Sequence, residues 1–345
     1  MGFAPARRAG QGGWRVSGAN KIVCFGEALI DMLAQSPATA DAPRAFLQFA
    51  GGAPANVAVA VARLGGDSHF AGMLGEDMFG DFLLQSLREA GVATDGVVRT
   101  REAKTALAFV ALDEHGERSF SFYRPPAADL LFRAEHFAAG LFEGAAVLHV
   151  CSNSMTEPGI AEVTLEGMRR AQAAGAIVSF DLNLRPMLWP AGVDPAPWLW
   201  QALALADVVK LSSEELDYLA GALGADAAAV ERKLWQGRAR LLLVTDGGSA
   251  LRWATRAERG EVPAFRVKVQ DTTAAGDAFV GGLLYQLARR LQGAAALDGF
   301  CADREAIAQA LRFAAAVGAL AVTRKGAFAA MPTLADVDTL IQEQP

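Results

Sequence analysis

Cysteine and histidine are scarce in this chain of 345 residues. The three cysteines, Cys24, Cys151 and Cys301, lie far apart and form no CxxC pair, and the four histidines form no HExxH motif. These absences argue against a disulfide framework and against a zinc site built from Cys and His. Isolated thiols are typical of a reducing compartment, so we expect a cytoplasmic protein.

The chain also lacks an excess of positive charge and a long apolar run. It has 32 Lys and Arg against 38 Asp and Glu, a net charge of −6 and a pI near 5.4. Nucleic-acid binding usually needs a basic face, and a membrane-spanning helix needs about 18 consecutive apolar residues. We therefore expect neither nucleic acid nor a membrane as a partner.

The first 20 residues lack the apolar core of a secretory signal. They are rich in Gly, Ala and Arg and poor in acidic residues, which faintly resembles an organelle transit peptide. A disordered tail, or a start codon placed too early, is the preferred interpretation. The predicted domain is therefore a single unit over residues 21–340.

Apolar residues make up 52% of the chain and charged residues 20%, as in a well-packed globular protein. Short apolar runs predict strands at 22–26, 68–73, 146–151, 176–181, 207–211 and 240–245. Helical periodicity with Pro at starts and Gly at ends predicts helices at 54–64, 79–90, 158–173, 196–204 and 213–220. This alternation predicts an α/β fold with a mainly parallel sheet that is covered by helices on both faces.

One stretch departs from this alternation. Residues 106–112 and 117–123 are two β-rich runs joined by Asp-Glu-His-Gly, which indicates a hairpin. With 46–49 they could form a small separate sheet, and an ordinary edge hairpin is the equal alternative. As a small sheet, the strands near 44–50 and 104–124 would be a lid inserted into the α/β domain.

Two segments have the composition of a ligand site. Residues 51–56 read Gly-Gly-Ala-Pro-Ala-Asn and open a helix, where bare backbone and the positive helix end suit oxygen-rich ligands, and Asn56 can both donate and accept. Residues 271–279 read Asp-Thr-Thr-Ala-Ala-Gly-Asp-Ala-Phe and also lead into a helix. Successive amides there would form an anion hole. Asp277 would then be a base for an attacking hydroxyl, or simply a first-turn carboxylate favoured by the helix dipole.

Together these segments resemble the two signatures of the ribokinase-like (PfkB) carbohydrate kinases. The N-terminal signature is matched by Gly51, Gly52, Pro54, Asn56, Ala58, Gly65 and Gly75, and the C-terminal signature, DTxGAGD, by residues 271–277. The resemblance covers about residues 21–335. It implies a Rossmann-type three-layer α/β sandwich with a small β-sheet lid, and a sugar kinase that uses ATP and Mg²⁺.

Within the family the chain is most similar to bacterial fructokinases. Residues 26–31 look like their opening strand and residues 122–131 like the segment that leaves their lid. Residues 181–186, Asp-Leu-Asn-Leu-Arg-Pro, are shared by fructokinases and 2-keto-3-deoxygluconate kinases. The resemblance therefore implies phosphorylation of D-fructose to fructose 6-phosphate, and a homodimer, since lids in this family often pair.

The resemblance also implies roles for individual residues. Asp277 would be the catalytic base, with the amides of Ala274, Ala275 and Gly276 holding the transferring phosphate. Sugar contacts would come from Asp31, Gly51, Gly52, Asn56, Arg124 and Arg185. The nucleotide would lie along Ser212, Thr245, Gly247 and Gly248. Glu215 would organise the magnesium waters, and a monovalent cation, such as K⁺, would lie near Asp271 and Thr273.

Two positions depart from the family pattern. Ala274 stands where glycine is common, and we expect the anion hole to survive only if its φ is negative. Ser212 and Glu215 replace the ends of an NxxE pattern, and they also read as a capping box for the following helix. No GxxxxGK[ST] motif is present, which excludes a P-loop kinase, and the GxGxxG of protein kinases and dinucleotide folds is absent too.

Several alternatives stay open. A 2-keto-3-deoxygluconate kinase would need a cationic clamp for its acid substrate, which Arg124 and Arg185 could supply. A ribokinase or another sugar or nucleoside kinase fits the signatures less well. Glu27 and Asp31 could pair as the acid and base of a glycosidase, but nothing else supports one. A non-catalytic sugar sensor on the same fold would not need a base at Asp277.

Overall fold

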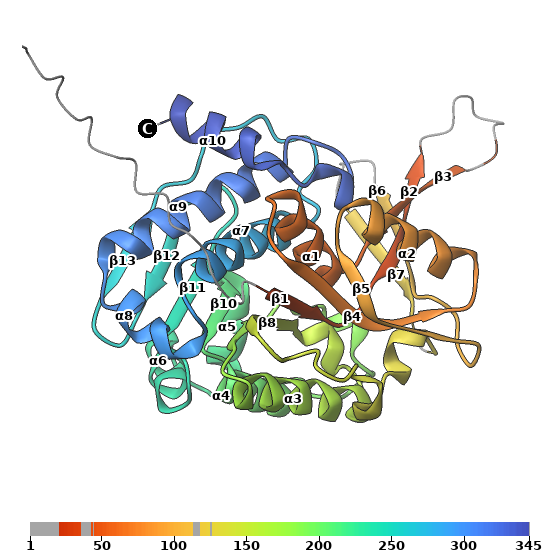
Figure 1. Ribbon diagram of the computed structural model, residues 1–345, viewed down its shortest axis with the longest axis horizontal. Helices are drawn as coiled ribbons and strands as arrows, with labels where there is room; N and C mark the ends of the chain where they lie inside the picture. The colour runs from red at the N-terminus through yellow and green to blue at the C-terminus, as the bar shows by residue number, and fades with distance from the viewer. Residues whose placement is uncertain (1–20, 36–42, 44, 113–117, 125, 345) are drawn as a thin grey trace, which may run out of the picture.

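The computed structural model describes residues 21–35, 43, 45–112, 118–124 and 126–344 (Figure 1). The tail predicted at 1–20, the hairpin turn predicted at 113–116 and Pro125 lie outside the described residues. A large α/β body is joined to a smaller sheet, which lies at the right of Figure 1. No described helix is long and apolar enough to cross a lipid bilayer.

The body is built on one large sheet. Its strands are β1 (Lys21–Phe25), β4 (Ser68–Gly75), β5 (Ala93–Thr100), β8 (Ala145–Cys151), β9 (Ile177–Asp181), β10 (Val208–Ser212), β11 (Leu241–Thr245), β12 (Leu251–Ala254) and β13 (Arg259–Val262). Across the described residues their order is β13-β12-β11-β10-β9-β8-β1-β4-β5. From β11 to β5 every neighbouring pair is parallel, whereas β12 and β13 extend the sheet antiparallel. The predicted α/β class and mainly parallel sheet are confirmed.

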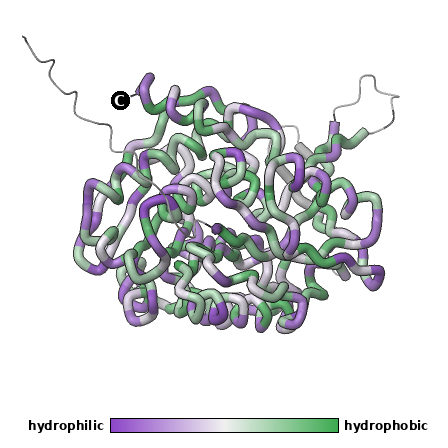
Figure 2. The backbone as a smooth tube through the Cα atoms, viewed as in Figure 1, coloured by the Kyte–Doolittle hydropathy of each residue, from purple (hydrophilic) through white to green (hydrophobic). Residues whose placement is uncertain are grey.

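Helices cover both faces of this sheet. The main ones are α1 (Ala53–Arg63), α2 (Met78–Glu89), α3 (Pro158–Ala173), α4 (Ala196–Leu205), α5 (Ser213–Ala222), α6 (Ala227–Gln236), α7 (Ala275–Arg290), α8 (Leu297–Cys301), α9 (Arg304–Ala321) and α10 (Leu334–Glu343). The apolar faces of α1, α2, α7, α8, α9 and α10 form one core with the sheet, and those of α3, α4, α5 and α6 form a second core on its other face. Figure 1 shows the two helical layers above and below the strands, and Figure 2 shows hydrophobic residues recurring through the middle of the chain trace.

Helix α1 is the most deeply enclosed of these helices. Residues Ala53 to Val61 are all buried, because α1 packs against β1 and β4 of the sheet and against α7. The approach to α7 needs a glycine: a Cβ on Gly281 would lie 2.5 Å from the Cβ of Ala60 and 3.2 Å from the carbonyl oxygen of Val57. This close crossing brings the beginnings of α1 and α7 together.

The second sheet has the order β3-β2-β6-β7. Its strands are β2 (Leu29–Gln35), β3 (Ala45–Gly51), β6 (Leu107–Leu112) and β7 (Arg118–Tyr123). The hairpin of β6 and β7 and the strand at 45–51 occur where the sequence predicted them. The sequence analysis ended the first strand at Gly26 and did not predict β2, which pairs with β3 and β6. At Gly26 the chain leaves the large sheet with a φ of +147°, which only glycine adopts readily.

The sequence also did not predict several elements outside the signatures, namely β5, β12, β13, α6, α8, α9 and α10. Short 3₁₀ turns complete the described chain at η1 (Ala128–Leu131), η2 (Ala134–His136), η3 (Ser152–Met155), η4 (Pro186–Leu188), η5 (Ala294–Ala296) and η6 (Phe328–Ala330). Of these, η3 directly follows β8 and belongs to the edge of the sheet described next.

Candidate active site

The polar residues of the candidate site gather at one edge of the large sheet. Strands β1, β8, β9, β10 and β11 are parallel, so their carboxyl ends lie along the same edge, which is where α/β sheets of this kind bind ligands. The register places Cys151 beside Asp181, Asp181 beside Lys210, and Ser212 beside Thr245. A row of polar side chains thus crosses the sheet.

The two sequence signatures meet in this region through a single hydrogen bond. The Nδ2 atom of Asn56 donates to Oδ2 of Asp277 at 2.7 Å, although 221 residues separate them. Asn56 lies in the first turn of α1 and Asp277 in the first turn of α7. The bond fixes the orientation of the Asp277 carboxylate and leaves its other oxygen for a second partner.

The surroundings of Asp277 shift its acidity toward neutral pH. The pKa of Asp277 is raised to about 7, chiefly by burial and also by the charge of Asp181, although the hydrogen bond from Asn56 and the charges of Lys210 and Arg185 act to lower it. A carboxylate with a pKa near the working pH is suited to general-base catalysis. The geometry and the acidity of Asp277 therefore favour a base over a simple first-turn carboxylate.

The residue before α7 corrects one prediction. Ala274 has a φ of +57° and lies in the left-handed region, so it does not have the negative φ that the sequence analysis set as a condition for the anion hole. A left-handed residue next to right-handed ones turns successive amides toward one side, and this nest is itself an anion-binding shape. The cost is strain, since a non-glycine residue in this region loses about 1–2 kcal/mol. Alanine at position 274 is therefore compatible with an anion hole.

Lys210 is a site residue that the sequence analysis missed. It lies on β10, is almost fully buried, and donates from Nζ to Oδ2 of Asp181 at 3.1 Å. Burial alone would lower the pKa of Lys210, but the carboxylates of Asp181 and Glu215 reverse this and raise it. A Cβ on Gly276 would lie 3.2 Å from Nζ, so the ammonium group is next to the start of α7. The sequence could have pointed to this residue, because a lysine is unusual within a buried strand such as Val-Val-Lys-Leu-Ser.

Ser212 and Glu215 form the capping box that the sequence offered as an alternative. Ser212 Oγ accepts from the Glu215 amide at 3.1 Å, and Glu215 Oε2 accepts from the Ser212 amide at 2.7 Å. Oε1 of Glu215 also accepts from the amide of Leu184 at 2.8 Å. Burial, followed by the charge of Asp181, raises the pKa of Glu215. Glu215 therefore joins the ends of β9 and β10, close to Lys210.

The predicted nucleotide residues lie further along the same edge. Thr245 ends β11 opposite Ser212 and donates from its hydroxyl to the carbonyl of Leu211 at 3.3 Å. The chain then turns, with a positive φ at Gly247, and both Gly247 and Gly248 are exposed. The structure thus brings these residues together with Ser212 and leaves an open backbone strip beside them.

Of the predicted sugar residues, Asp31 lies on β2 and Gly51 ends β3 of the small sheet, and Gly52 joins this sheet to α1. The Asp31 carboxylate rests directly over the Cα atom of Gly51, where any side chain would clash with it. A Cβ on Gly52 would lie 2.6 Å from the carbonyl oxygen of Glu27, and its φ of +102° also calls for glycine. Both glycines are therefore required by close packing against neighbouring groups.

A cavity of about 110 Å³ separates the small sheet from the loop before α7. Its lining comes from both sides and consists of Asp31, Leu33, Phe49, Val110, Gln270, Asp271, Thr273, Lys325, Gly326 and Ala327. Asp271 accepts from the amides of Thr273 at 2.8 Å and of Gly326 at 3.1 Å. A larger hollow of about 500 Å³ lies at the start of α2, and its acidic residues already have hydrogen-bond or ion-pair partners. The smaller cavity is the one that adjoins the chemistry.

The two predicted arginines have different surroundings. Arg124 is buried, and its guanidinium donates to Oδ2 of Asp129 at 2.8 and 2.6 Å and to Thr156 at 3.3 Å. Arg185 is exposed, hydrogen-bonds the carbonyl of Leu184 at 3.2 Å, and its charge reaches Asp277. Arg185 is therefore placed to meet a ligand, whereas the charge of Arg124 is already matched within the protein.

The residues at this edge suit a cation that is bound mainly by water and by the phosphates of a nucleotide. Among the described residues, no three His, Cys, Asp or Glu side chains come close enough to enclose a metal. Asp181, Glu215 and Asp277 nevertheless supply oxygen atoms around Lys210. Mg²⁺ in nucleotide sites keeps most of its waters and phosphate ligands and needs only one or two carboxylates. The donor set fits such an ion.

A large, mainly parallel sheet with helices on both faces, joined to a second small sheet, defines a ribokinase-like α/β fold. The chain belongs to the pfkB family of carbohydrate kinases, since the model of the family described as pfkB family carbohydrate kinase matches residues 19–334. The family inferred from the two signatures is confirmed.

Named relatives agree with this placement. The chain is 42% identical to Fructokinase-1 of Zea mays over 329 residues, which covers 95% of this chain and 99% of the relative. It is 70% identical to a fructokinase of Xylella fastidiosa whose structure holds bound ATP, with a TM-score of 0.92 and coverage of 94% and 99%. A fructokinase of Vibrio cholerae O395, solved with fructose, ADP and calcium ion, is 35% identical, with a TM-score of 0.81 and coverage of 93% and 98%.

Proposed function

We propose that this protein is a fructokinase that transfers the γ-phosphoryl group of ATP to the 6-hydroxyl of D-fructose. The observation that carries the proposal is the hydrogen bond between Asn56 and Asp277, because it places a base of near-neutral pKa at the start of α7. Similarity to fructokinases over nearly the whole chain supports the choice of sugar. The products are fructose 6-phosphate and ADP.

In the proposed reaction Asp277 takes the proton of the sugar hydroxyl as its oxygen attacks the γ-phosphorus. The bond between this phosphorus and the bridging oxygen breaks, and ADP leaves with the electron pair. The amides of Ala275 and Gly276 and the ammonium group of Lys210 stabilise the charge on the transferring group. The proton of the hydroxyl therefore ends on Asp277, and the negative charge of the transferring group is stabilised by the amides and the ammonium group at the beginning of α7.

The nucleotide and its cations are assigned to further residues at the carboxyl edge of the large sheet and in the loop before α7. The half-buried Ser212 and Thr245 and the exposed Gly247 and Gly248 would carry ATP. Glu215 would hold the waters of Mg²⁺, which supplies charge neutralisation between the phosphates. Asp271 and Thr273 would hold a monovalent cation, such as K⁺. Activity after chelation, with Mg²⁺ restored alone or together with K⁺, tests these assignments.

The sugar would be held by Asp31, Gly51, Gly52, Asn56 and Arg185. Arg124 is removed from the predicted contacts because Asp129 already binds its guanidinium at 2.6 Å. An acid substrate such as 2-keto-3-deoxygluconate needs an uncompensated cationic clamp, and only one of the two arginines offered for it is exposed. The distribution of charge therefore favours an uncharged sugar.

The deciding experiment measures ADP release with ATP and Mg²⁺ for D-fructose, 2-keto-3-deoxygluconate, ribose and no sugar. We expect rapid release with fructose alone. Release with the keto acid alone would keep the mechanism and overturn the substrate. Fructose binding without release would identify a sugar sensor and overturn the catalytic role.

Arg185→Ala should raise the KM for the sugar.

We also infer a homodimer that is formed through the small sheet. Its strands expose Phe46 and Tyr123, and Phe109 makes edge contacts with the rings of both. A continuous apolar surface on a lid is suited to a second copy of the same surface. Light scattering should give twice the chain mass, and Phe46→Ser should shift it toward the monomer.

A cytoplasmic location is part of the same proposal. Cys24, Cys151 and Cys301 form no disulfide, and the first two are buried. Free thiols are stable in a reducing compartment, where ATP is also supplied. Fractionation of cells, followed by the fructose-dependent ADP assay, tests the location.

A further inference from the structure

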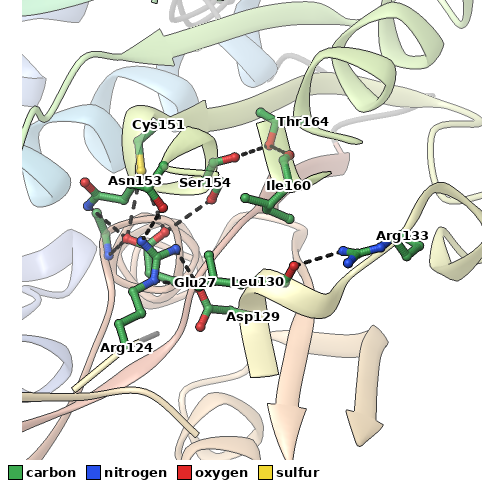
Figure 3. Close-up of polar contacts among 12 residues, drawn as sticks. Glu27, Arg124, Asp129, Leu130, Arg133, Cys151, Asn153, Ser154, Ile160 and Thr164 are labelled. Atoms are coloured by element: carbon green, nitrogen blue, oxygen red, sulfur yellow. Dashed lines mark hydrogen bonds and ion pairs between the residues drawn. The ribbon is translucent and has the colours of Figure 1, made fainter. Parts of the chain in front are cut away.

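A buried polar cluster lies beside the sugar-binding residues but contains none of the proposed catalytic groups. The Glu27 cluster consists of Glu27, Arg124, Asp129, Asn153 and Ser154 (Figure 3). These side chains come from the end of β1, from the segment that leaves β7, and from the turn after β8. Glu27 is 2% exposed and Arg124 is 1% exposed. Burial of charges costs free energy unless they are paired. In this cluster the charges pair with one another, which raises the question of what the paired charges do for the protein.

Glu27 joins two backbone segments that shape the sugar site. Its Oε1 accepts from the amide of Ala53 at 3.3 Å and from Nδ2 of Asn153 at 3.1 Å, and its Oε2 accepts from Oγ of Ser154 at 3.3 Å. Ala53 is the first residue of α1 and directly follows Gly52. The carboxylate thus caps the helix whose first turn carries Asn56.

Arg124 brings the small sheet into the same network. It follows β7 directly, and its charge acts on Glu27 while its guanidinium binds Asp129 and Thr156. Figure 3 shows the guanidinium beside the Glu27 carboxylate, between the turn after β8 and the Asp129 side chain. The exit from the small sheet and the start of α1 are therefore held by neighbouring buried charges.

We propose that Glu27 is a positioning residue that holds the sugar-binding turn, residues 51–56, in register with the exit of the small sheet through Arg124. It touches neither sugar nor phosphate. Because ordered neighbours of a binding residue reduce its freedom before the ligand arrives, the cluster would act on sugar affinity rather than on the chemical step. The inference rests on the proposed function, since it assigns this turn to the sugar.

The main test is Glu27→Gln, which keeps the size of the side chain and one acceptor but removes the charge beside Arg124. We expect the KM for fructose to rise at least 10-fold, while the KM for ATP and kcat change less than 3-fold. Glu143→Gln is the matched control, because Glu143 is exposed and precedes the amino end of β8, at the edge of the sheet opposite to the site; it should leave all three values unchanged. A parallel rise in both KM values, or no rise for fructose in folded Glu27→Gln protein, would overturn the proposal.

Two further measurements separate this inference from the proposed function. Hydrogen exchange of the amides at 53–57 should be at least 10-fold faster in Glu27→Gln, with no change at the start of α7, and this readout needs no turnover. The kinetic comparison uses whichever sugar the wild type phosphorylates. If the wild type does not phosphorylate fructose, the proposed substrate is overturned, and the role of Glu27 can still be tested with the sugar that is phosphorylated. Arg124→Lys combined with Glu27→Gln should raise the sugar KM by less than the product of the single effects, because both act in one network. A full product would show that the two residues act separately.

Discussion

Asn56 and Asp277 share a hydrogen bond of 2.7 Å that joins the first turn of α1 to the first turn of α7. The pair connects one residue assigned to the sugar with the residue assigned to proton transfer. Its geometry follows from the glycine crossing of the two helices at Gly281. Changes at either end should therefore separate binding from catalysis.

Asp277→Asn should lower kcat by ~10²–10⁴, the usual contribution of a positioned base. The fold and sugar binding should persist, since Asn can still accept a hydrogen bond from Asn56. Steady-state ADP release and fructose binding by calorimetry measure the two effects. The same substitution at exposed Asp338 is the control, and near-normal turnover in Asp277→Asn would remove Asp277 from the role of base.

The pH profile should report the carboxyl of Asp277. Burial raises its pKa to about 7, and only the ionised form can accept a proton, so kcat/KM for fructose should rise with pH through about 7 and then level. Asn56→Ala removes a hydrogen bond that lowers this pKa, so its midpoint should lie at higher pH. An unchanged midpoint in that variant would contradict the assignment.

Ionised Asp277 should also cost stability. Its folded-state pKa of about 7 exceeds the ordinary 3.8, so the folded protein binds this proton more tightly than the unfolded chain does. Its contribution to stability is therefore complete below pH 4 and is lost as the pH rises through 7. With ~1.36 kcal/mol per unit, Asp277→Asn should be more stable than the wild type at pH 8, by at most ~4 kcal/mol. Urea unfolding at pH 4 and pH 8 measures the difference, and Asp338→Asn should show none.

Lys210→Met should destabilise the fold by about 3–5 kcal/mol, because it leaves the buried charge of Asp181 unpaired. The double variant Lys210→Met with Asp181→Asn should recover much of this stability, since neither buried charge remains. Activity should stay low in both variants if Lys210 stabilises the transferring phosphate. Urea unfolding and ADP release distinguish the two effects, and recovered activity in the double variant would leave Lys210 a purely structural role.

Ala274→Gly should stabilise the protein by about 0.5–1 kcal/mol. Relief of the left-handed strain gains ~1–2 kcal/mol, whereas the greater freedom of glycine in the unfolded chain offsets ~0.5–1 kcal/mol of it. Ala275→Gly is the matched control, because residue 275 is already right-handed and should only lose stability. Equal losses in both variants would show that the φ of Ala274 carries no strain.

The sequence predicted those parts of the molecule that local patterns determine. Strand β8 and helix α3 were found because apolar runs and helical periodicity are properties of neighbouring residues. The two glycine-rich segments were found because their small residues are unusual at a helix start. Strand β2 was missed because it is defined by pairing with β3 and β6, which lie further along the chain, and a local pattern does not reveal that pairing.

Contacts between distant segments were harder to predict. Lys210 acquires its role from Asp181 and from the start of α7, and neither is close in sequence. Arg124 was assigned to the sugar because the sequence does not show that Asp129 binds it. In both cases the decisive information is which charges share a buried space, and this appears only after the strands are ordered.

The way the chain enters and leaves the small sheet has a consequence for engineering. Among the described elements, the chain crosses between the body and this sheet at four short connections, which follow β1, β3, β5 and β7. The sheet is therefore not a cassette that can be cut out at two points and replaced by that of another kinase. A chimera would have to exchange two separate stretches together and also preserve the partners of Glu27 and Arg124 at the seams. Selection for new sugars should accordingly proceed by point substitutions within the sheet rather than by recombination of whole lids.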